Sequence, residues 1–146
     1  ELLKVEPQSF GSSFEEESQF EDSMWISRLT KENIHVFGAI EKEELIGIVL
    51  AVTNPRVKIG HVATLNSMFV KEGFRGKQVG HSLVNHAIDY LNDLGVEQLL
   101  LSVVTENVRA IQLYERNNFE AYAIEEQAIK LNEYYYDLLL MKRKLK

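Results

Sequence analysis

The chain has no cysteine and only two prolines among its 146 residues. Without cysteine it can form no disulfide, thiolate nucleophile or cysteine metal site, and this composition fits a reducing compartment. Its longest apolar stretches, such as residues 99–104, are far shorter than the roughly 20 residues that a membrane-spanning helix needs. No basic segment followed by an apolar one opens the chain, so no secretion signal is expected. We therefore expect a cytoplasmic protein with no membrane partner.

Positive charge is also scarce. The chain has 16 lysines and arginines against 22 aspartates and glutamates, which gives a net charge of −6. Domains that bind nucleic acid usually carry a basic patch, so this balance predicts no nucleic-acid partner. The densest basic cluster, residues 142–144, is typical of a solvated tail. An acidic protein that binds a polyanionic ligand needs a local device of backbone amides and a few basic side chains.

The length fits one domain, so we expect a single domain over residues 1–146. Its amino-terminal part predicts a short acidic helix, capped near residues 11–13 and running through Phe20, Trp25 and Leu29. Apolar runs then predict strands, with a bulge at residues 66–67, and helical apolar spacing predicts two helices. The expected strands cover residues 34–40, 45–52, 61–70, 97–104, 119–130 and 134–143, and the expected helices follow residues 80 and 107. This order predicts a mixed α/β sheet flanked by helices.

The segment Arg75–Gly80 lies between an expected strand and the clearest expected helix. The first amides of a helix lack internal partners, and the helix dipole adds partial positive charge there. Glycines allow a phosphate to approach the backbone closely, and Arg75 and Lys77 add formal positive charge. The segment therefore predicts a pyrophosphate cradle, distinct from a Walker loop or a dinucleotide fingerprint. A polar turn leading into a helix is the alternative interpretation.

The residues Met68–Val70 and the loop Arg75–Gly80 are followed by a second group of residues with a characteristic spacing. That group consists of Asn107, Ala110, Leu113, Tyr114, Asn118 and Phe119. Together the two groups resemble the acetyl-CoA binding core of the GNAT N-acetyltransferase superfamily, over residues 34 to 143. The segments 7–13 and 135–137 resemble a bacterial GNAT subgroup whose substrates are undefined.

The resemblance implies the GNAT acyl-CoA N-acyltransferase fold, in which helices flank a central mixed, mostly antiparallel sheet. The family's first strand would precede Glu1, so the resemblance implies that this strand is missing from the chain. It also implies an acetyl-CoA dependent N-acetyltransferase, which moves the acetyl group of this co-substrate directly to a primary amine and uses no metal. The acceptor would be a small-molecule amine or a peptide amine, and a homodimer is left open.

The resemblance also implies a role for individual residues. Main-chain groups of Met68 and Val70 would hold the thioester and the pantetheine, and Arg75 with the amides of residues 76–81 would hold the pyrophosphate. Asn107 would contact the pantetheine arm, and Tyr114 would protonate the leaving thiolate. A phenol with a pKa of about 10 can supply a proton to a thiol with a pKa of about 8.5 as charge develops. The expected cofactor-binding set is Met68, Phe69, Val70, Arg75, Gly76, Lys77, Gln78, Val79, Gly80, His81, Asn107 and Tyr114.

The chain departs from the family pattern at three positions. Gln78 replaces the middle glycine of the loop, so this turn forms without the conformational freedom of glycine. Asn118 replaces the glycine before Phe119, a mild change because asparagine tolerates the left-handed conformation. Ser102 stands where many members place the general base, a glutamate. We therefore expect the base elsewhere, with Glu125 and Glu126 as candidates on the next strand, besides Glu106.

Several alternatives stay open at this level. Asn107 can serve only as a helix cap, or as a cap and a ligand at once, and Tyr114 can be a core residue. No histidine has the spacing to a carboxylate that a metal site requires, so we expect no metal. Ser102 and Gln78 also fit a catalytically silent acyl-CoA binding or sensor domain. Transfer to a protein N-terminus, or of a longer acyl group, is a third alternative.

Overall fold

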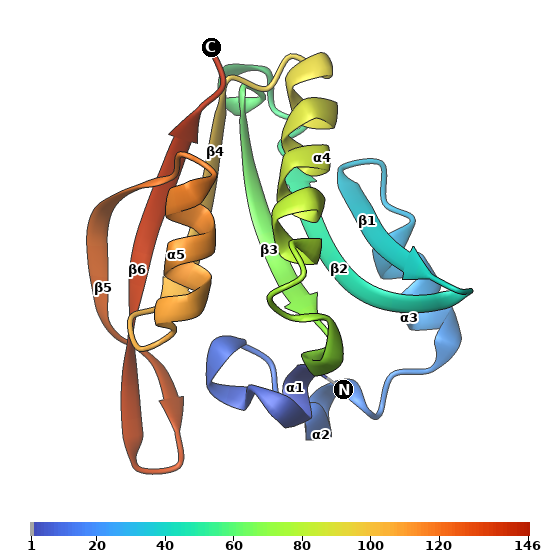
Figure 1. Ribbon diagram of the computed structural model, residues 1–146, viewed down its shortest axis with the longest axis vertical. Coiled ribbons are helices and arrows are strands. Elements are labelled where there is room, and N and C mark those ends of the chain that lie inside the picture. Colours follow the sequence, from blue (N-terminus) through green and yellow to red (C-terminus); the bar gives the residue numbers. More distant parts are fainter. Residues whose placement is uncertain (1) are drawn as a thin grey trace.

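The computed structural model describes residues 2–146, apart from the side chains of Leu2 and Val5 (Figure 1). Its six-stranded sheet has the order β1-β2-β3-β4-β6-β5. Neighbouring strands are antiparallel except for β3 and β4. The strands are β1 Ile34–Glu41, β2 Glu44–Thr53, β3 Val62–Val70, β4 Gln98–Val104, β5 Glu120–Leu131 and β6 Tyr134–Lys144. The predicted mixed, mostly antiparallel sheet is confirmed, and the alternating and continuous apolar runs placed each strand within one or two residues.

Two long helices, α4 and α5, lie together in front of this sheet, while α1 and α2 lie at its lower end and α3 lies behind β2 (Figure 1). The helical elements are α1 Leu2–Val5, η1 Pro7–Ser9, α2 Phe14–Glu17, α3 Asp22–Leu29, η2 Val57–Ile59, η3 Glu72–Phe74, α4 Val79–Asp93 and α5 Val108–Arg116. Among these described elements no helix is long and apolar enough to cross a membrane.

The prediction of one acidic helix through Leu29 is wrong. Ser13 does cap a helix, because it forms a capping box with Glu16, but this helix ends at Glu17. The hydroxyl of Ser18 then donates to the carbonyl of Glu15 at 3.1 Å. Such a side-chain bond offers the backbone an alternative to continuing the helix. A second helix, α3, starts only at Asp22.

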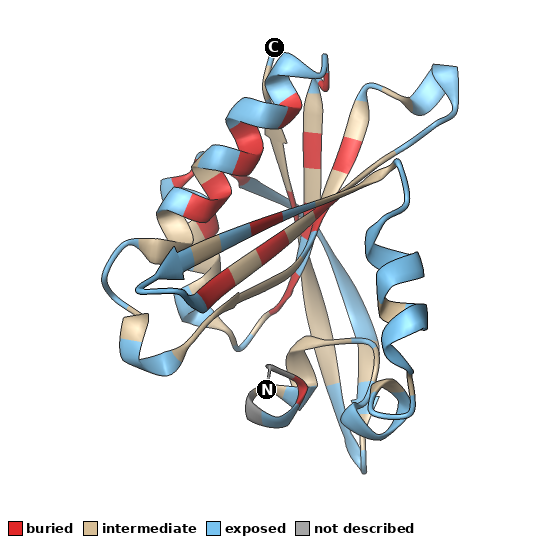
Figure 2. Ribbon diagram, turned by 90° about the vertical axis from the view of Figure 1, so that its right-hand side faces the viewer, coloured by how far each residue is buried: buried red, intermediate tan, exposed pale blue. Residues whose placement is uncertain are grey.

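The core lies between the sheet and α4, where the predicted apolar face of the helix is buried (Figure 2). Its buried residues are Leu83, Val84, Ala87, Ile88 and Leu91. The helix ends in a Schellman motif: Gly95 has φ +84, and the Val96 N–H donates to the Leu91 carbonyl at 3.0 Å. Gly95 therefore forms the carboxyl-terminal cap of α4.

The parallel pair at the centre of the sheet is short. β3 and β4 pair only from Val62 with Gln98 to Thr64 with Leu100. Beyond this point the two strands have no register partners on their facing edges, and the sheet opens between residues 65–70 and 101–104. The predicted bulge lies at the same place, because Ser67 has φ +52 and the register with β2 shifts between Ile48 and Leu50. The opening in the sheet positions the site described below.

Candidate active site

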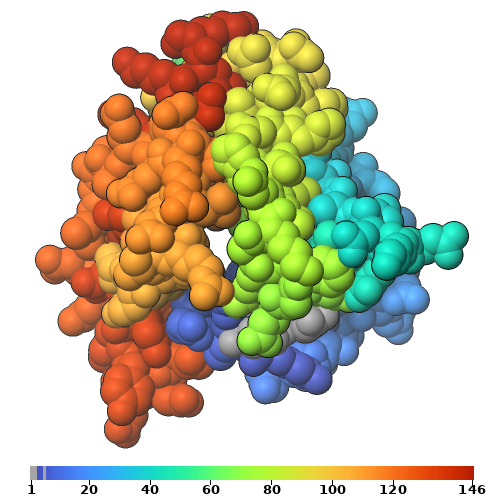
Figure 3. Space-filling model, in the orientation of Figure 1, coloured from blue at the N-terminus to red at the C-terminus, as the bar shows by residue number. Residues whose placement is uncertain are grey.

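A cleft of about 1210 Å³ occupies the opening between β3 and β4. It is lined by the ends of these strands, by the start of α4, by one side of α5, by parts of β5 and β6, and by the segment that contains η1. Figure 3 shows the hollow between α5 and the beginning of α4, with amino-terminal residues below it. The cleft therefore joins segments that are far apart in the sequence.

The loop before α4 forms one wall of the cleft. Gly76 has φ +77 and Gln78, the residue that caps α4, has φ +63. A left-handed conformation is uncommon for glutamine, so Gln78 is held in a backbone shape that glycine would adopt more easily. The turn directs the first amides of α4, a helix of 15 residues, toward the cleft. These amides have no partners inside the helix and suit a phosphate group.

Gly80 allows three elements to approach one another at this wall. A Cβ atom at Gly80 would lie 3.0 Å from the Cε of Met68 on β3 and 3.2 Å from a Cδ of Leu113 on α5. The absence of a side chain thus lets α4 pack closely against both neighbours. The backbone of Gly80 also remains accessible at the cleft.

The side chain of Arg75 is engaged within the protein. Its Nη2 lies 2.7 Å from the carboxylate of Glu6, and its Nε donates to the Val70 carbonyl at 2.9 Å. Lys77, in contrast, is exposed and its ammonium lies 5.1 Å from the ring centroid of Phe74. Arg75 therefore links the loop to β3 and to the amino-terminal segment.

The main chain of Val70 faces the cleft. Ile48 of β2 is the register partner of Phe69, and the N–H of Lys71 donates to the Ile46 carbonyl at 2.9 Å. Because bonded residues alternate along an antiparallel strand, the polar groups of Val70 point away from β2. The Val70 carbonyl accepts a hydrogen bond from Arg75, so the Val70 N–H is the main-chain group that remains available to an extended ligand.

Asn107 caps α5, as one of the alternatives above predicted. Its Oδ1 accepts a hydrogen bond from the Ala110 N–H at 3.1 Å. The residue also lines the cleft, and its amide nitrogen is not needed for the cap. Asn107 can therefore act as a cap and contact a ligand at once.

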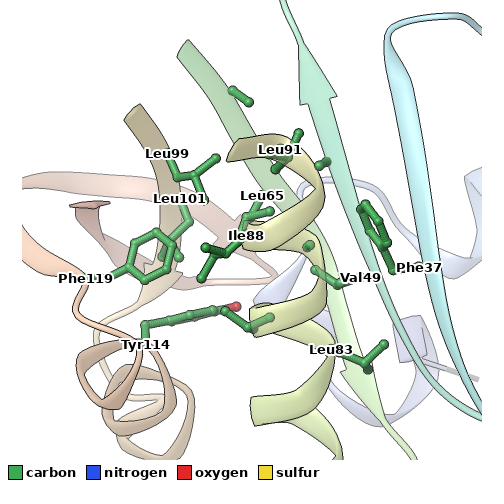
Figure 4. Packing of buried hydrophobic residues seen from close by; sticks show 14 of the residues in the cluster. Phe37, Val49, Leu65, Leu83, Ile88, Leu91, Leu99, Leu101, Tyr114 and Phe119 are labelled. Atoms are coloured by element: carbon green, nitrogen blue, oxygen red, sulfur yellow. The ribbon is translucent and has the colours of Figure 1, made fainter. Parts of the chain in front are cut away.

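Tyr114 belongs both to the core and to the cleft. It is only 7% exposed, and its ring packs edge-on against Phe119 with centroids 5.8 Å apart. In Figure 4 its hydroxyl points from α5 toward α4. Burial raises the pKa of Tyr114 above its ordinary value, since desolvation disfavours the phenolate. The residue is thus a neutral phenol at physiological pH.

A second Schellman motif holds Tyr114 in this position. Asn118 has φ +58, its N–H donates to Glu115 at 2.9 Å, and the Phe119 N–H donates to the Tyr114 carbonyl at 3.0 Å. Asparagine fills a site that often holds glycine, as the sequence predicted. The motif brings the Phe119 ring onto the Tyr114 ring.

The carboxylates predicted as bases do not line the cleft, although Ser102 does. Glu125 and Glu126 are exposed on β5, and Glu106 is exposed beside Thr105. Glu125 is the register partner of Leu138, which lines the cleft and is itself the partner of Val104. Register partners point to the same face of a sheet, so Glu125 shares the face of the cleft. Glu126 lies in an irregular stretch of β5 between Glu125 and Ile129.

Sequence reasoning missed a group of lining residues. The amino-terminal ones, Glu6, Ser9 and Phe10, lie in or beside the segment that resembled a bacterial subgroup, but this resemblance assigned them no role. Arg109, Gln112 and Arg116 of α5 also line the cleft. Their spacing of three and four residues places them on one side of the helix, and this pattern could have identified them. Within residues 2–146 no group of three or more His, Asp or Glu residues could hold a metal ion.

An open, mostly antiparallel sheet that parts beside a helix amino-terminus defines the acyl-CoA N-acyltransferase class of α/β folds. Comparison with known proteins specifies the class further. A family model described as the acetyltransferase (GNAT) family matches residues 1–119. The chain belongs to this family.

Individual relatives agree with this assignment. Streptothricin acetyltransferase of Streptomyces lavendulae is 30% identical over 122 residues, which cover 81% of this chain and 57% of that protein. The acetyltransferase of the GNAT family from Streptococcus pneumoniae has a TM-score of 0.82 at 20% identity, covering 99% of this chain and 89% of that one. The protein yncA of Salmonella typhimurium, solved with its cofactor acetyl-CoA, has a TM-score of 0.75 at 18% identity, covering 84% of this chain and 71% of that one. These two structures show the fold alone, and the chain spans less than two thirds of the curated relatives it matches.

Proposed function

We propose that this protein is an acetyl-CoA dependent N-acetyltransferase that transfers the acetyl group directly to a primary amine. The observation that carries the proposal is that the unpartnered amides at the start of α4 and the side chain of Tyr114 line the same cleft. Membership of the acetyltransferase family supports the same activity.

The residues of the cleft fit acetyl-CoA. The α4 amides would bind the pyrophosphate. Lys77 is exposed beside them and does not line the cleft, and it would add positive charge at the cleft's edge. The free N–H of Val70 and the amide nitrogen of Asn107 would bind the pantetheine, whose extended amide chain suits an unpaired strand edge. Arg75 would position the loop through Glu6 and Val70.

Bound acetyl-CoA supplies the thioester that the amine attacks and the thiolate that leaves. Tyr114 would donate its phenolic proton to this sulfur. Its raised pKa keeps the proton on the oxygen at neutral pH, and the same desolvation raises the affinity of the thiolate for a proton. The buried ring therefore remains a suitable donor.

The amine must lose a proton before or during its attack. Of the two predicted carboxylates, Glu125 shares the face of Leu138 in the cleft wall. We propose that it receives this proton through water, because its side chain is exposed and does not line the cleft.

The proposal is tested by two measurements on the same sample. Calorimetry should detect acetyl-CoA binding, and 3′-dephospho-coenzyme A should compete if the pyrophosphate is the anchor. A panel of amines, amino acids and peptides should then release free coenzyme A, measured as thiol. Failure to bind acetyl-CoA would refute the proposal.

A catalytically silent acyl-CoA binding domain is the second candidate. It is favoured by Ser102, which lines the cleft where many family members have a glutamate. This candidate predicts acetyl-CoA binding without release of coenzyme A by any acceptor. The amine panel therefore separates the two functions.

A further inference from the structure

We propose that the acceptor of this cleft is a monoamine with an apolar body, and that the hydroxyl of Ser9 orients its amino group. The inference rests on the proposed acetyl transfer, and names the substrate class of that site. It follows from the charges and polar groups on the side of the cleft away from α4.

The acceptor side of the cleft is formed by η1 with the residue after it and by β4, β5 and β6. The element η1 packs against β4 and β5, which places Ser9 opposite the open end of the sheet. The apolar residues that line this side are Phe10, Val104, Ala128, Ile129 and Leu138. Its polar side-chain groups are the hydroxyls of Ser9, Ser12 and Ser102, of which the Ser12 hydroxyl donates to the carboxylate of Glu17 at 2.6 Å.

No unpaired carboxylate lies on this side among the described lining residues. The acidic residues that line the cleft are Glu6 and Glu72. Glu6 is bound to Arg75 at 2.7 Å, and Glu72 belongs to η3, which directly precedes the loop Arg75–Gly80. A second ammonium group on the acceptor would therefore find no carboxylate in the cleft lining, and its desolvation would be costly. Glu125 shares this face of the sheet but is exposed and does not line the cleft.

The same neutrality assists the chemistry of a monoamine. An apolar surrounding disfavours the ammonium form and lowers the pKa of an amine, whereas a nearby carboxylate would stabilise that form. Only the neutral amine has the lone pair that forms the new C–N bond. As that bond forms, the C–S bond breaks, the thiolate takes the Tyr114 proton, and the nitrogen loses one proton through water to Glu125.

Ser9 supplies the polar group that such an amine needs. Its Oγ is buried and has no hydrogen-bond partner, while its N–H donates to the Glu6 carbonyl at 3.0 Å. A buried hydroxyl without a partner is uncommon and requires an explanation. The Oγ can accept a hydrogen bond from an amine N–H, leaving the nitrogen lone pair free to attack.

The first test compares hexylamine with 1,6-diaminohexane, which carries a second ammonium group at the far end of the same six-carbon chain. The kcat/KM, measured from coenzyme A release, should be about 100-fold or more higher for hexylamine than for the diamine, because the diamine carries one uncompensated charge. Equal or better use of the diamine would overturn the substrate class while leaving acetyl transfer intact. No transfer to any amine would overturn the proposed function and this inference together.

The second test uses variants in the amino-terminal segment. Ser9→Ala should raise the KM for hexylamine about threefold to tenfold, the loss of one neutral hydrogen bond, without changing kcat or acetyl-CoA affinity. Ser9→Thr should restore the KM. Ser18→Ala, which removes a hydroxyl bonded to the Glu15 carbonyl outside the cleft, is the control and should leave the KM unchanged. If Ser9→Ala leaves the KM unchanged, or alters kcat and acetyl-CoA affinity as much as KM, Ser9 does not orient the amine.

Discussion

Tyr114 is held by more contacts than a simple proton donor would need. The Schellman motif at the end of α5 fixes its backbone, and the Phe119 ring packs against its side chain. These contacts are made by the ring and the main chain, and the hydroxyl is the part that lies toward α4 (Figure 4). A substitution that removes only the hydroxyl can therefore separate chemistry from packing.

We predict that Tyr114→Phe lowers kcat by about 10²- to 10⁴-fold, the usual contribution of general acid catalysis. The affinity for acetyl-CoA should change little because the ring is retained. The rate of coenzyme A release gives kcat, and calorimetric titration gives the affinity for acetyl-CoA. Turnover at the wild-type rate would make Tyr114 a core residue alone.

The left-handed backbone conformation of Gln78 can be tested through the free energy of unfolding of a glycine variant. Gln78→Gly should raise the free energy of unfolding by up to about 1 kcal/mol, because glycine adopts a positive φ without the penalty borne by other residues. The neighbouring Lys77→Gly is the control, since Lys77 has no positive φ, and it should destabilise slightly. Urea unfolding measures both, and a destabilised Gln78→Gly protein would contradict the assigned backbone shape.

At the scale of elements, the ion pair between Arg75 and Glu6 connects the loop before α4 to the residue that precedes η1. Both side chains are about a quarter exposed, at 23% and 27%, so the pair itself contributes about 1 kcal/mol or less. The bond from Arg75 to the Val70 carbonyl adds a charged hydrogen bond inside the loop. Arg75 therefore acts on the loop as a whole.

We predict that Arg75→Ala weakens acetyl-CoA binding about tenfold, or about 1.4 kcal/mol. Because Arg75 acts through the loop, this loss should be similar at low and high salt, whereas the loss from Lys77→Ala should shrink as salt screens its phosphate contact. Glu6→Gln should weaken binding by a smaller factor. Tighter binding by Glu6→Gln would instead show that the ion pair withholds Arg75 from the phosphates.

The strand β5 provides a matched pair of carboxylates. We expect Glu125→Gln to lower kcat/KM for the amine and to remove one ionisation from its pH profile, because Glu125 shares the cleft face. Glu126→Gln, in the adjoining irregular stretch, is the control and should leave the profile unchanged. The pH dependence of coenzyme A release measures both, and an unchanged profile in both variants would place the base elsewhere.

For the whole molecule, the buried phenol of Tyr114 links stability to pH. Its folded-state pKa lies above the unfolded value of about 10, so the unfolded chain releases this proton first. The stabilising contribution is therefore complete below pH 10 and is lost as the pH rises above it, by up to about 1.4 kcal/mol per pH unit.

Tyr114→Phe should consequently lose less stability than wild type between about pH 10 and pH 11.5. Tyr134→Phe is the control, because Tyr134 is 72% exposed and its removal should leave the wild-type slope. Denaturant unfolding across this range measures the slopes. Parallel slopes for wild type and Tyr114→Phe would mean that Tyr114 ionises in the folded protein as it does in the unfolded chain.

Local patterns in the sequence determined the strands, the two long helices and their ends. Periodicity, the Asn107 cap and the left-handed turns at Gly95 and Asn118 each depend on neighbouring residues, so the sequence alone predicts them. The proposed phosphate-binding loop is also a local feature, because it lies within six consecutive residues, Arg75–Gly80. The amino-terminal helix was mispredicted because a single side-chain bond at Ser18 competes with helix continuation.

Only the tertiary structure decided which distant residues meet at the cleft. Arg75 forms an ion pair with Glu6, which lies far from it in the sequence. The contacts of η1 with β4 and β5 likewise exist only in the folded chain. The position of Glu125 depends on pairing across β5 and β6, including the irregular stretch that follows it. Contacts of this kind join residues far apart in the chain, and spacing along a sequence carries no information about which of them will pack together.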